Sequence, residues 1–139
     1  MIAKQKRVLF VCVGNACRSQ MAEAFARAYG SDVMVAASAG LAPGMNVPPD
    51  TVRAMAEKNL DLRHHFPKGI RNLGRSEFDL VVNMSGFPLP DQREPVLEWE
   101  VDDPVFMDYE QHCEVRDRIE RLVLELILKL RREQSGGRG

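Results

Sequence analysis

The chain has few cysteines and almost no excess charge. Only three of its 139 residues are cysteine, and its formal net charge is −1, with no long basic run. The low cysteine count excludes a disulfide-stapled secreted scaffold and, without a signal-peptide pattern, predicts a reducing, cytoplasmic setting. The near-neutral charge gives no electrostatic reason to expect binding to nucleic acid.

The sequence also has no apolar run of membrane-spanning length and no internal repeat. We therefore expect no membrane association. A hydrophobic content of 45% over 139 residues is enough for one core, so residues 1–139 are expected to form a single domain. The two ends, residues 1–6 and 134–139, are expected to be flexible.

Common nucleotide and metal motifs are missing as well. The chain has neither the Gly-Lys-Ser/Thr ending of a nucleotide-binding P-loop nor the three-glycine dinucleotide fingerprint. Cys12 and Cys17 have a spacing that zinc tolerates, but no second Cys or His pair accompanies them. His64 and His65 are adjacent and do not share one helical face. We therefore expect no metal site and no cofactor.

What the chain does have is one chemically rich segment, residues 8–23, which reads V-L-F-V-C-V-G-N-A-C-R-S-Q-M-A-E. An apolar strand runs into Cys12, and a helix is expected to start near Ser19. A helix N-terminus directs N–H groups and the positive end of its dipole at a neighbouring sulfur, which favours the nucleophilic thiolate. Ser19 is expected to be the N-cap, and its hydroxyl can donate to that thiolate.

The same loop suits a tetrahedral oxyanion, because N–H groups after a Gly-containing turn bind phosphate-like groups. Gly14 is expected to let the backbone curl closely, and Asn15 tolerates left-handed geometry. Arg18 adds a permanently charged planar fork that can hold two oxygens at once. A buried strand cysteine, an ordinary turn and a solvated arginine form the alternative explanation, which does not account for these features in combination.

The rest of the chain alternates predicted strands and helices, which is typical of a parallel sheet. Strands are expected at about 8–13, 33–37 and 78–84, a further segment at 97–101 leads into a turn, and helices are expected at about 19–29, 48–59 and 110–132. We predict an α/β, single-domain, three-layer fold with a central, mostly four-stranded parallel sheet flanked by helices. Ligands of such sheets bind beyond the carboxyl ends of the strands, where Cys12 should lie.

A cysteine that cleaves a phosphate ester needs a group to protonate the leaving oxygen. Asp102 and Asp103, just before Pro104, are the candidates. Proline biases the residue before it to an extended conformation, which fixes how that side chain leaves the backbone. In isolation both aspartates would be ordinary loop carboxylates, but beside the Cys12 loop one of them becomes a candidate acid.

Four segments together resemble the low-molecular-weight protein tyrosine phosphatase family, which includes arsenate reductases of the same fold. The segments are C-V-G-N-A-C-R-S at 12–19, S-A-G at 38–40, F-D-L-V-V-N-M at 78–84 and D-D-P at 102–104. The resemblance implies that Cys12 is the nucleophile, that Arg18 holds the oxyanion and that Asp103 is the general acid. It leaves Asp102 to end the strand, cap the following turn or support its neighbour.

The resemblance also implies a set of binding and supporting residues. The substrate would be bound by the loop residues Val13, Gly14, Asn15, Ala16, Cys17 and Ser19. Asn15 and Ser38 match positions whose side chains hold the loop in shape, although Ser38 could simply end a strand. His65 resembles a histidine of the same network, and a surface position explains it equally well.

Within the family the chain gives mixed signals. Gln20 and the segment 98–104, with Trp99, resemble the arsenate-reductase branch, whereas typical phosphatases have proline in place of Gln20 and aromatic residues just after the Asp-Pro. A phosphotyrosine ring needs apolar walls, and this chain offers only a modest set of them. The candidate wall residues are Val13, Ala16, Met45, Val105 and Phe106.

The cysteine positions argue against an internal disulfide relay. A thioredoxin-coupled arsenate reductase has a resolving cysteine after the strand that here ends in N-M-S-G, and this chain has Ser85 there. Cys113 is expected to be a packing residue in or near the last helix. Cys17 is close enough in sequence to trap Cys12 in a reversible, protective disulfide.

We therefore expect a cysteine-dependent phosphomonoester hydrolase, most closely a low-molecular-weight protein tyrosine phosphatase that acts through a phosphocysteine intermediate. The alternative is an arsenate reductase of the same fold that uses an external thiol. A non-catalytic oxyanion or redox sensor built on Cys12 and Cys17 is a third hypothesis, but it has no need for Asp103. The expected partner is a phosphorylated protein or a small phosphate or arsenate oxyanion, and the oligomeric state stays open.

Overall fold

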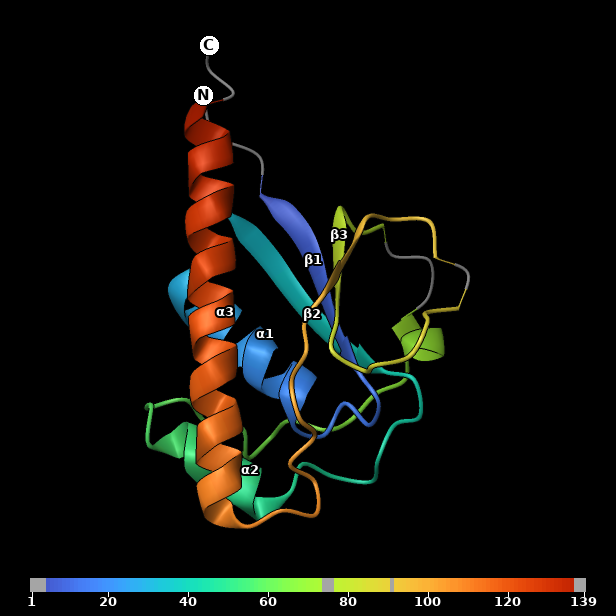
Figure 1. The fold of residues 1–139 in the computed structure, drawn as a ribbon, viewed down its shortest axis with the longest axis vertical. Coiled ribbons are helices and arrows are strands. Elements are labelled where there is room, and N and C mark those ends of the chain that lie inside the picture. Colours follow the sequence, from blue (N-terminus) through green and yellow to red (C-terminus); the bar gives the residue numbers. More distant parts are fainter. Residues whose placement is uncertain (1–4, 74–76, 91, 137–139) are drawn as a thin grey trace.

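The computed structural model describes residues 5–73, 77–90 and 92–136. At its centre is one sheet of four parallel strands in the order β2-β1-β3-β4 (Figure 1). The strands are β1 (Lys6–Cys12), β2 (Met34–Gly40), β3 (Leu80–Asn83) and β4 (Val96–Glu98). The predicted α/β class and the four-stranded parallel sheet are confirmed.

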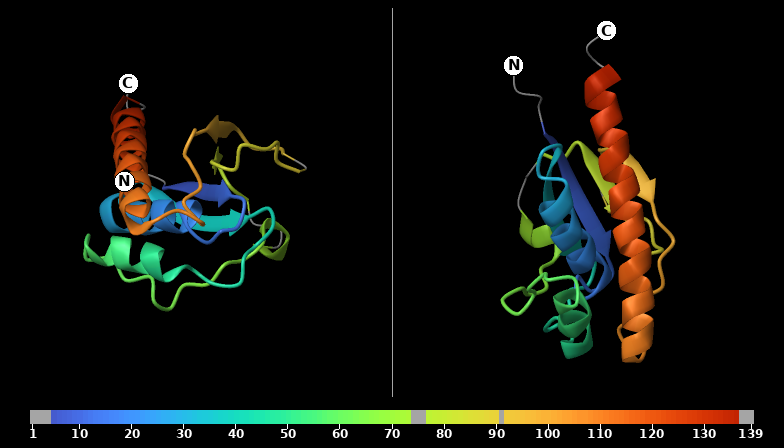
Figure 2. Two further views of the ribbon diagram at one scale, coloured as in Figure 1. Left: turned by 60° about the horizontal axis from the view of Figure 1, so that its bottom comes forward. Right: turned by 90° about the vertical axis from the view of Figure 1, so that its left-hand side faces the viewer.

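Three α-helices and one short 3₁₀ helix surround the sheet. They are α1 (Arg18–Tyr29), α2 (Pro49–Ala56), η1 (Ile70–Leu73) and α3 (Tyr109–Gly136). The α-helices pack together on one face, where the main hydrophobic core lies, whereas η1 and loop residues cover the other face (Figure 2). The three predicted layers are thus an α-helical layer, the sheet and a thinner layer made of η1 and loops.

The central strand β1 shows why the sheet forms at this place. Its residues Val8 to Cys12 are all buried, which matches a strand covered on both faces. Because side chains alternate across a strand, Phe10 and Cys12 face the α-helical core, while Leu9 and Val11 face the smaller cluster beside η1. Hydrogen-bonded neighbours on both sides fix the register of β1, and that register fixes the position of Cys12.

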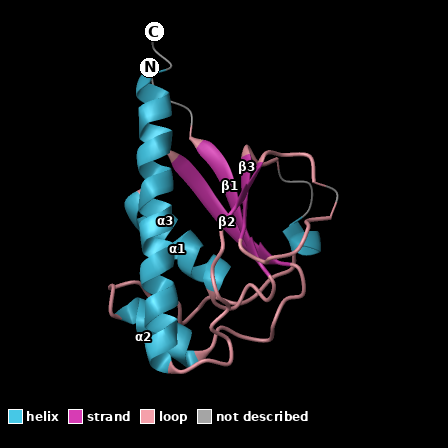
Figure 3. Ribbon diagram, in the orientation of Figure 1, coloured by secondary structure: helices cyan, strands magenta, loops and turns pink. Residues whose placement is uncertain are grey.

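The carboxyl ends of the strands meet at one edge of the sheet. Cys12 is the register partner of Gly40 at the end of β2, and Val11 is the partner of Asn83 at the end of β3. The loops after these strands gather at the same edge (Figure 3). This edge is where the sequence predicts the ligand to bind.

Most predicted elements are present, but several ends differ. Of the segment 97–101, only residues 97 and 98 are strand, at the end of β4. Trp99 follows with its ring beside Phe10, with ring centroids 6.0 Å apart. The helix predicted at 48–59 ends at Ala56, and Asn59 adopts a left-handed φ of 61° just after it.

The chain ends also differ from expectation. Lys6 and residues 134–136, expected to be flexible, belong to β1 and α3. Residues 1–4 and 137–139 lie outside the described residues. Within the described ranges, no helix is both long and apolar enough to span a membrane.

Candidate active site

The loop between β1 and α1 turns its first carbonyl oxygens toward the segment that follows β2. The carbonyl oxygens of residues 12, 13 and 14 accept hydrogen bonds from N–H groups of residues 41, 42 and 44 at 2.8 to 3.1 Å. In a planar trans peptide the N–H points away from its carbonyl, so the following N–H groups point to the opposite side. Successive N–H groups that face one side form a concave site for an anion.

The close backbone approach that sequence assigned to Gly14 belongs to Gly40. A Cβ on Gly14 would meet only ordinary contacts at 3.8 Å or more, whereas a Cβ on Gly40 would lie 2.7 to 2.9 Å from backbone atoms of residues 13–15. The tight turn itself is made by Asn15, which has a φ of 50°. Asn15 therefore takes the left-handed conformation that its residue type tolerates.

Cys12 lies at the base of this loop and is buried. Its Sγ is 3.0 Å from Ser19 Oγ, and Asn15 Nδ2 donates to the same Ser19 oxygen at 2.6 Å. Because the Ser19 oxygen accepts from Asn15, its own proton is available to the sulfur. Ser19 is not the N-cap, since α1 starts at Arg18 and Cys17 takes the cap position without a side-chain hydrogen bond.

Arg18, in the first turn of α1, connects the loop to the other side of the site. Its Nη1 donates to the carbonyl oxygen of Met84 and, at 3.1 Å, to that of Val101, and its Nη2 lies 3.3 Å from Asp103 Oδ2. The guanidinium is buried, and its Nε is without a hydrogen-bond partner among the described residues. A buried donor without a partner is costly, so an oxyanion oxygen would be a favourable acceptor here.

The structure places Asp103, and not Asp102, against Arg18. Asp103 Oδ1 accepts the N–H of Val105 at 3.2 Å, while its Oδ2 faces the guanidinium. The turn after the strand is therefore capped by Asp103, which excludes only the capping role among the three expected for Asp102. Asp102 is exposed and lines the same pocket as Arg18 and Asp103.

Ser38 belongs to a polar cluster behind the loop. Its Oγ donates to Glu23 Oε1 at 2.5 Å, and Lys68 Nζ approaches the same serine oxygen at 3.3 Å. Ser38 and Glu23 are both buried, and Lys68 is half-buried. Burial lowers the pKa of the Lys68 ammonium, and the nearby Glu23 carboxylate partly offsets that effect.

His65 reaches the loop only through Gln20. Its Nδ1 lies 3.0 Å from Gln20 Oε1, while Gln20 Nε2 donates to the backbone oxygen and to Oδ1 of Asn15, both at 3.1 Å, and to the carbonyl of Phe66 at 3.0 Å. Gln20 is fully buried. The residue that marked a branch of the family in the sequence is thus a direct support of the loop.

Cys17 is buried on the far side of the loop, beneath α2. Thr51 Oγ1 donates to its Sγ at 3.2 Å, and the same oxygen lies 3.0 Å from Nδ1 of the buried His112. Burial raises the pKa of the Cys17 thiol to about 12, although the hydrogen bond from Thr51 opposes this. Cys17 therefore stays a thiol at neutral pH and does not compete with Cys12 as a nucleophile.

Two further positions, Ser85 and Cys113, bear on whether the chain could use an internal disulfide relay. Ser85, after β3, donates from its Oγ to Asn83 Oδ1 at 2.6 Å and is buried. Cys113 lies in α3, as expected, and its Sγ contacts Glu57 and Arg116 at 3.7 Å each.

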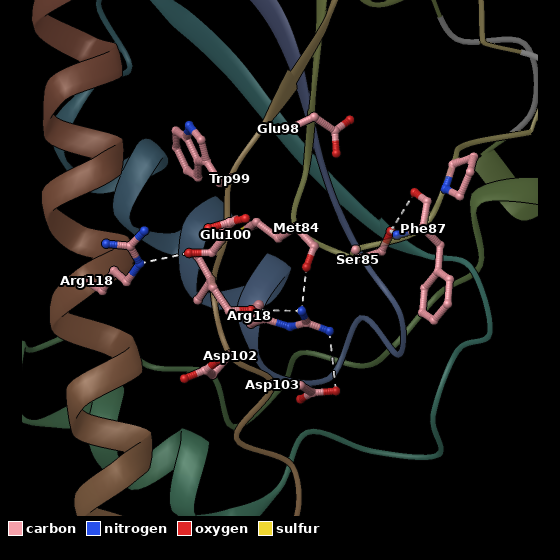
Figure 4. A pocket seen from close by; sticks show the side chains of 13 residues that line it. Arg18, Met84, Ser85, Phe87, Glu98, Trp99, Glu100, Asp102, Asp103 and Arg118 are labelled. Atoms are coloured by element: carbon pink, nitrogen blue, oxygen red, sulfur yellow. Dashed lines mark hydrogen bonds and ion pairs between the residues drawn. The ribbon is translucent and has the colours of Figure 1, made fainter.

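Arg18 and Asp103 line a pocket of about 950 Å³ (Figure 4). Its walls come from the segment after β3, from residues 98–103 and from Arg118 on α3. Two of the predicted apolar wall residues do not form a wall, because Met45 and Phe106 are 96% and 97% exposed. Within the described residues, no group of three or more His, Cys, Asp or Glu side chains gathers as a metal site.

Sequence reasoning missed Lys68, Glu23 and Gly40 as parts of the site. Lys68 contacts the loop across 53 residues of sequence and Glu23 contacts Ser38 across 15, so no local pattern indicates them. Gly40 did have a signal, since it ends the S-A-G segment at 38–40. What the site offers chemically is a buried thiol, a cradle of N–H groups, one buried cation and one carboxylate beside it.

One family model matches more than half of the chain. The model of the family described as low molecular weight phosphotyrosine protein phosphatase matches residues 7–93. A glutaredoxin arsenate reductase from Synechocystis sp. is 32% identical over 130 residues, which cover 90% of this chain and 98% of that protein.

Solved structures extend the comparison. An arsenate reductase in the phosphate binding state has a TM-score of 0.82 and 32% identity, and the match covers 91% of this chain and 99% of that chain. The YwlE arginine phosphatase from Geobacillus stearothermophilus also has a TM-score of 0.82, over 94% of this chain and 96% of that one, but at 23% identity it shows the shared fold alone. The chain belongs to the low-molecular-weight phosphotyrosine protein phosphatase family.

Proposed function

We propose that this protein reduces arsenate, with Cys12 as the nucleophile and an external thiol as the electron donor. The observation that carries the proposal is the loop itself. A buried thiol contacts Ser19, the carbonyls of residues 12–14 are turned to residues 41–44, and Arg18 keeps a buried Nε unpaired within the described part of the chain. Such a site stabilises a tetrahedral oxyanion and the charge that develops on it.

We choose arsenate over a phosphate ester as the substrate because of the similarity to arsenate reductases. The relatives that match this chain over nine-tenths of its length at 32% identity are named arsenate reductases. Gln20, which resembles that branch, supports the loop through two hydrogen bonds to Asn15. The exposed Met45 and Phe106 leave little wall for a phosphotyrosine ring, which favours a small oxyanion.

The electron donor is expected to be a thiol of another molecule, because the chain's own cysteines are poorly placed for this role. Ser85 occupies the position after β3 where a resolving cysteine would be needed, and a hydroxyl cannot form a disulfide. Cys113 contacts Glu57 and Arg116 on the helical face, and Cys17 is a buried thiol with a pKa of about 12. Neither is placed as a ready thiolate for the second step.

In the proposed reaction, arsenate is reduced through an adduct with Cys12 and a mixed disulfide. The Cys12 thiolate attacks arsenic, and one oxygen leaves as water after Asp103 supplies a proton. A donor thiolate then attacks Sγ of the adduct, the S–As bond breaks, and its electron pair stays with arsenic, which leaves as arsenite. A second donor thiol reduces the mixed disulfide on Cys12, so that two thiols are oxidised for each arsenate.

Hydrolysis of a phosphate monoester is the second candidate, and Asp103 favours it. Its carboxylate lies beside Arg18 and is 37% exposed, so it can protonate a leaving oxygen and then activate water. In this reaction Cys12 attacks phosphorus, and water releases phosphate from the cysteine. No second thiol is needed.

The two candidates are separated by measuring arsenite formation and aryl phosphate hydrolysis side by side. Arsenate is supplied with thioredoxin, with glutaredoxin and glutathione, or with mycothiol, each with its reductase. We expect thiol-dependent arsenite formation that Cys12→Ser abolishes and that Cys113→Ser retains. Hydrolysis without arsenite formation in any of the three systems would select the second candidate. Loss of turnover in Cys113→Ser would contradict an external donor.

A further inference from the structure

Lys68 lies between α2 and η1, and its backbone is fixed on both sides. Its N–H donates to Asn15 Oδ1 at 2.9 Å, and its carbonyl accepts the N–H of Gly40 at 2.9 Å. Asn15 belongs to the Cys12 loop, and Gly40 ends β2. The Lys68 peptide therefore ties the loop to the sheet, and the side chain starts from a fixed point beside both.

The ammonium of Lys68 lies among oxygens from three parts of the chain. Its Nζ is 3.3 Å from Ser38 Oγ, 3.5 Å from Asn15 Oδ1 and 3.8 Å from Glu23 Oε1. A buried carboxylate such as Glu23 is costly unless it is paired. Arg27 pairs with the other oxygen, Oε2, at 3.0 Å, but its side chain is 60% exposed. Lys68 is thus the inner counter-charge of Glu23.

Asn15 connects this cation to the nucleophile. Its Oδ1 accepts the backbone N–H of Lys68 and Nε2 of Gln20, and Lys68 Nζ adds a third contact at 3.5 Å. Its Nδ2 is therefore directed at Ser19 Oγ, 2.6 Å away. Ser19 in turn contacts Cys12 Sγ. If the amide were turned over, its oxygen would face Ser19, the serine would donate to Asn15, and the sulfur would lose its donor. The orientation of one amide therefore decides whether the thiolate is stabilised.

We propose that Lys68 is a positioning residue for Cys12, which orients Asn15 and offsets the charge of Glu23 so that Ser19 donates to the thiolate. Lys68 acts through Asn15 and Ser19 and does not touch the reacting atoms. The charged groups that face it are Glu23 and Arg27 from α1. The inference rests on the proposed role of Cys12 as nucleophile, but its test does not require turnover.

The test compares Lys68→Met with the parent protein. Alkylation of Cys12 by iodoacetamide is followed from pH 5 to 9 by peptide mass spectrometry, and binding of inorganic phosphate is measured by calorimetry. We expect the alkylation midpoint to rise by about half a pH unit or more, because Glu23 loses its inner counter-charge and Asn15 Oδ1 loses one of its three donors. Phosphate affinity should fall by roughly tenfold, because the loop loses shape and the Glu23 charge is uncovered.

Matched variants separate positioning from general effects. Lys68→Arg keeps the charge and should recover at least half of the shift. Arg27→Met removes a cation from the same glutamate without touching Asn15, so its midpoint should equal that of the parent. Ethylammonium added to Lys68→Ala should lower the midpoint again. Circular dichroism checks the fold, and Lys68→Gln takes the place of the Met variant if that variant does not fold.

Two outcomes would overturn the proposal. One is a Lys68→Met or Lys68→Gln protein whose midpoint stays within about 0.2 pH units and whose phosphate affinity stays within about twofold of the parent. The other is an equal shift in Arg27→Met, which would assign the effect to net charge. Failure of both candidate activities in the parent would refute the proposed function and leave the alkylation comparison standing.

Discussion

The two sides of the site are built in different ways. The Cys12 side is a continuous stretch of chain from β1 into α1, buried and tied by hydrogen bonds to distant segments, such as that of Lys68, 53 residues from Asn15. The Asp103 side is an irregular segment after β4, and Asp103 is held by one backbone N–H and by Arg18. The nucleophile is therefore pre-organised by the fold, whereas the position of the acid depends largely on Arg18.

Because Arg18 is the link between the two sides, changing it should have the largest effect. Arg18→Lys loses the planar fork, the unpaired Nε and the paired contacts to Met84, Val101 and Asp103. We expect turnover to fall by roughly a thousandfold or more, since even one oxyanion donor contributes on the order of a hundredfold. The measurement is the kcat/KM of arsenite formation and of aryl phosphate hydrolysis. A loss of less than about tenfold in both reactions would mean that the Cys12 loop is active without the contacts that Arg18 makes to the Asp103 side.

The Asp103 side is tested by a matched pair of neighbours. Asp103→Asn should lower aryl phosphate hydrolysis by about a hundredfold or more, because an amide cannot protonate the leaving oxygen. Asp102→Asn, at an exposed position, should have little effect. Arsenite formation should fall as well, because Asp103 supplies the proton with which one arsenate oxygen leaves as water. The opposite ranking of the two aspartates would reassign the acid.

The same contrast explains what could be predicted from sequence. The Cys12 side was visible because its donors and nucleophile are neighbours in the chain and need one strand, one turn and one helix. Gly14 was nevertheless given the role of Gly40, since close approach between two segments depends on the register of β1 and β2. Lys68 could not be found, because its partners meet only after the sheet has formed.

The Asp103 side was found by resemblance more than by pattern. The Asp-Asp-Pro sequence left two candidates, and only the contact with Arg18 distinguishes Asp103 by position. The turn contact expected of Asp102 is made by Asp103, because its Oδ1 faces the N–H of Val105. Side chains in an irregular segment have no period from which their direction could be deduced.

Gly40→Ala tests the Cys12 side alone, because the atoms nearest to the added Cβ would all be backbone atoms of the Cys12 loop. The added Cβ would lie within 2.9 Å of backbone atoms of the loop, which cannot move as a flexible side chain does. We expect a loss of about 1 to 3 kcal/mol in the free energy of unfolding. Turnover should fall on the order of tenfold as the cradle of N–H groups shifts. Gly14→Ala is the control and should be milder on both counts, as measured by urea denaturation and kcat/KM.

The smallest effect concerns the buried thiol beneath the loop. The pKa of Cys17 is raised from an ordinary value of 9.0 to about 12, so between these values the unfolded chain loses a proton that the folded chain keeps. The folded state then binds more protons, and the free energy of unfolding must fall as the pH rises above 9. Tyr29, whose pKa is also raised to about 12, adds to the same slope.

The free energy of unfolding of Cys17→Ala should therefore depend less on pH than that of the parent between pH 9 and pH 11, as measured by urea denaturation. Tyr29→Phe is the matched control for the second contribution. Equal slopes in Cys17→Ala and the parent would mean that the thiol beneath the loop is already ionised or exposed, and that the Cys12 side is less tightly closed than its hydrogen bonds indicate.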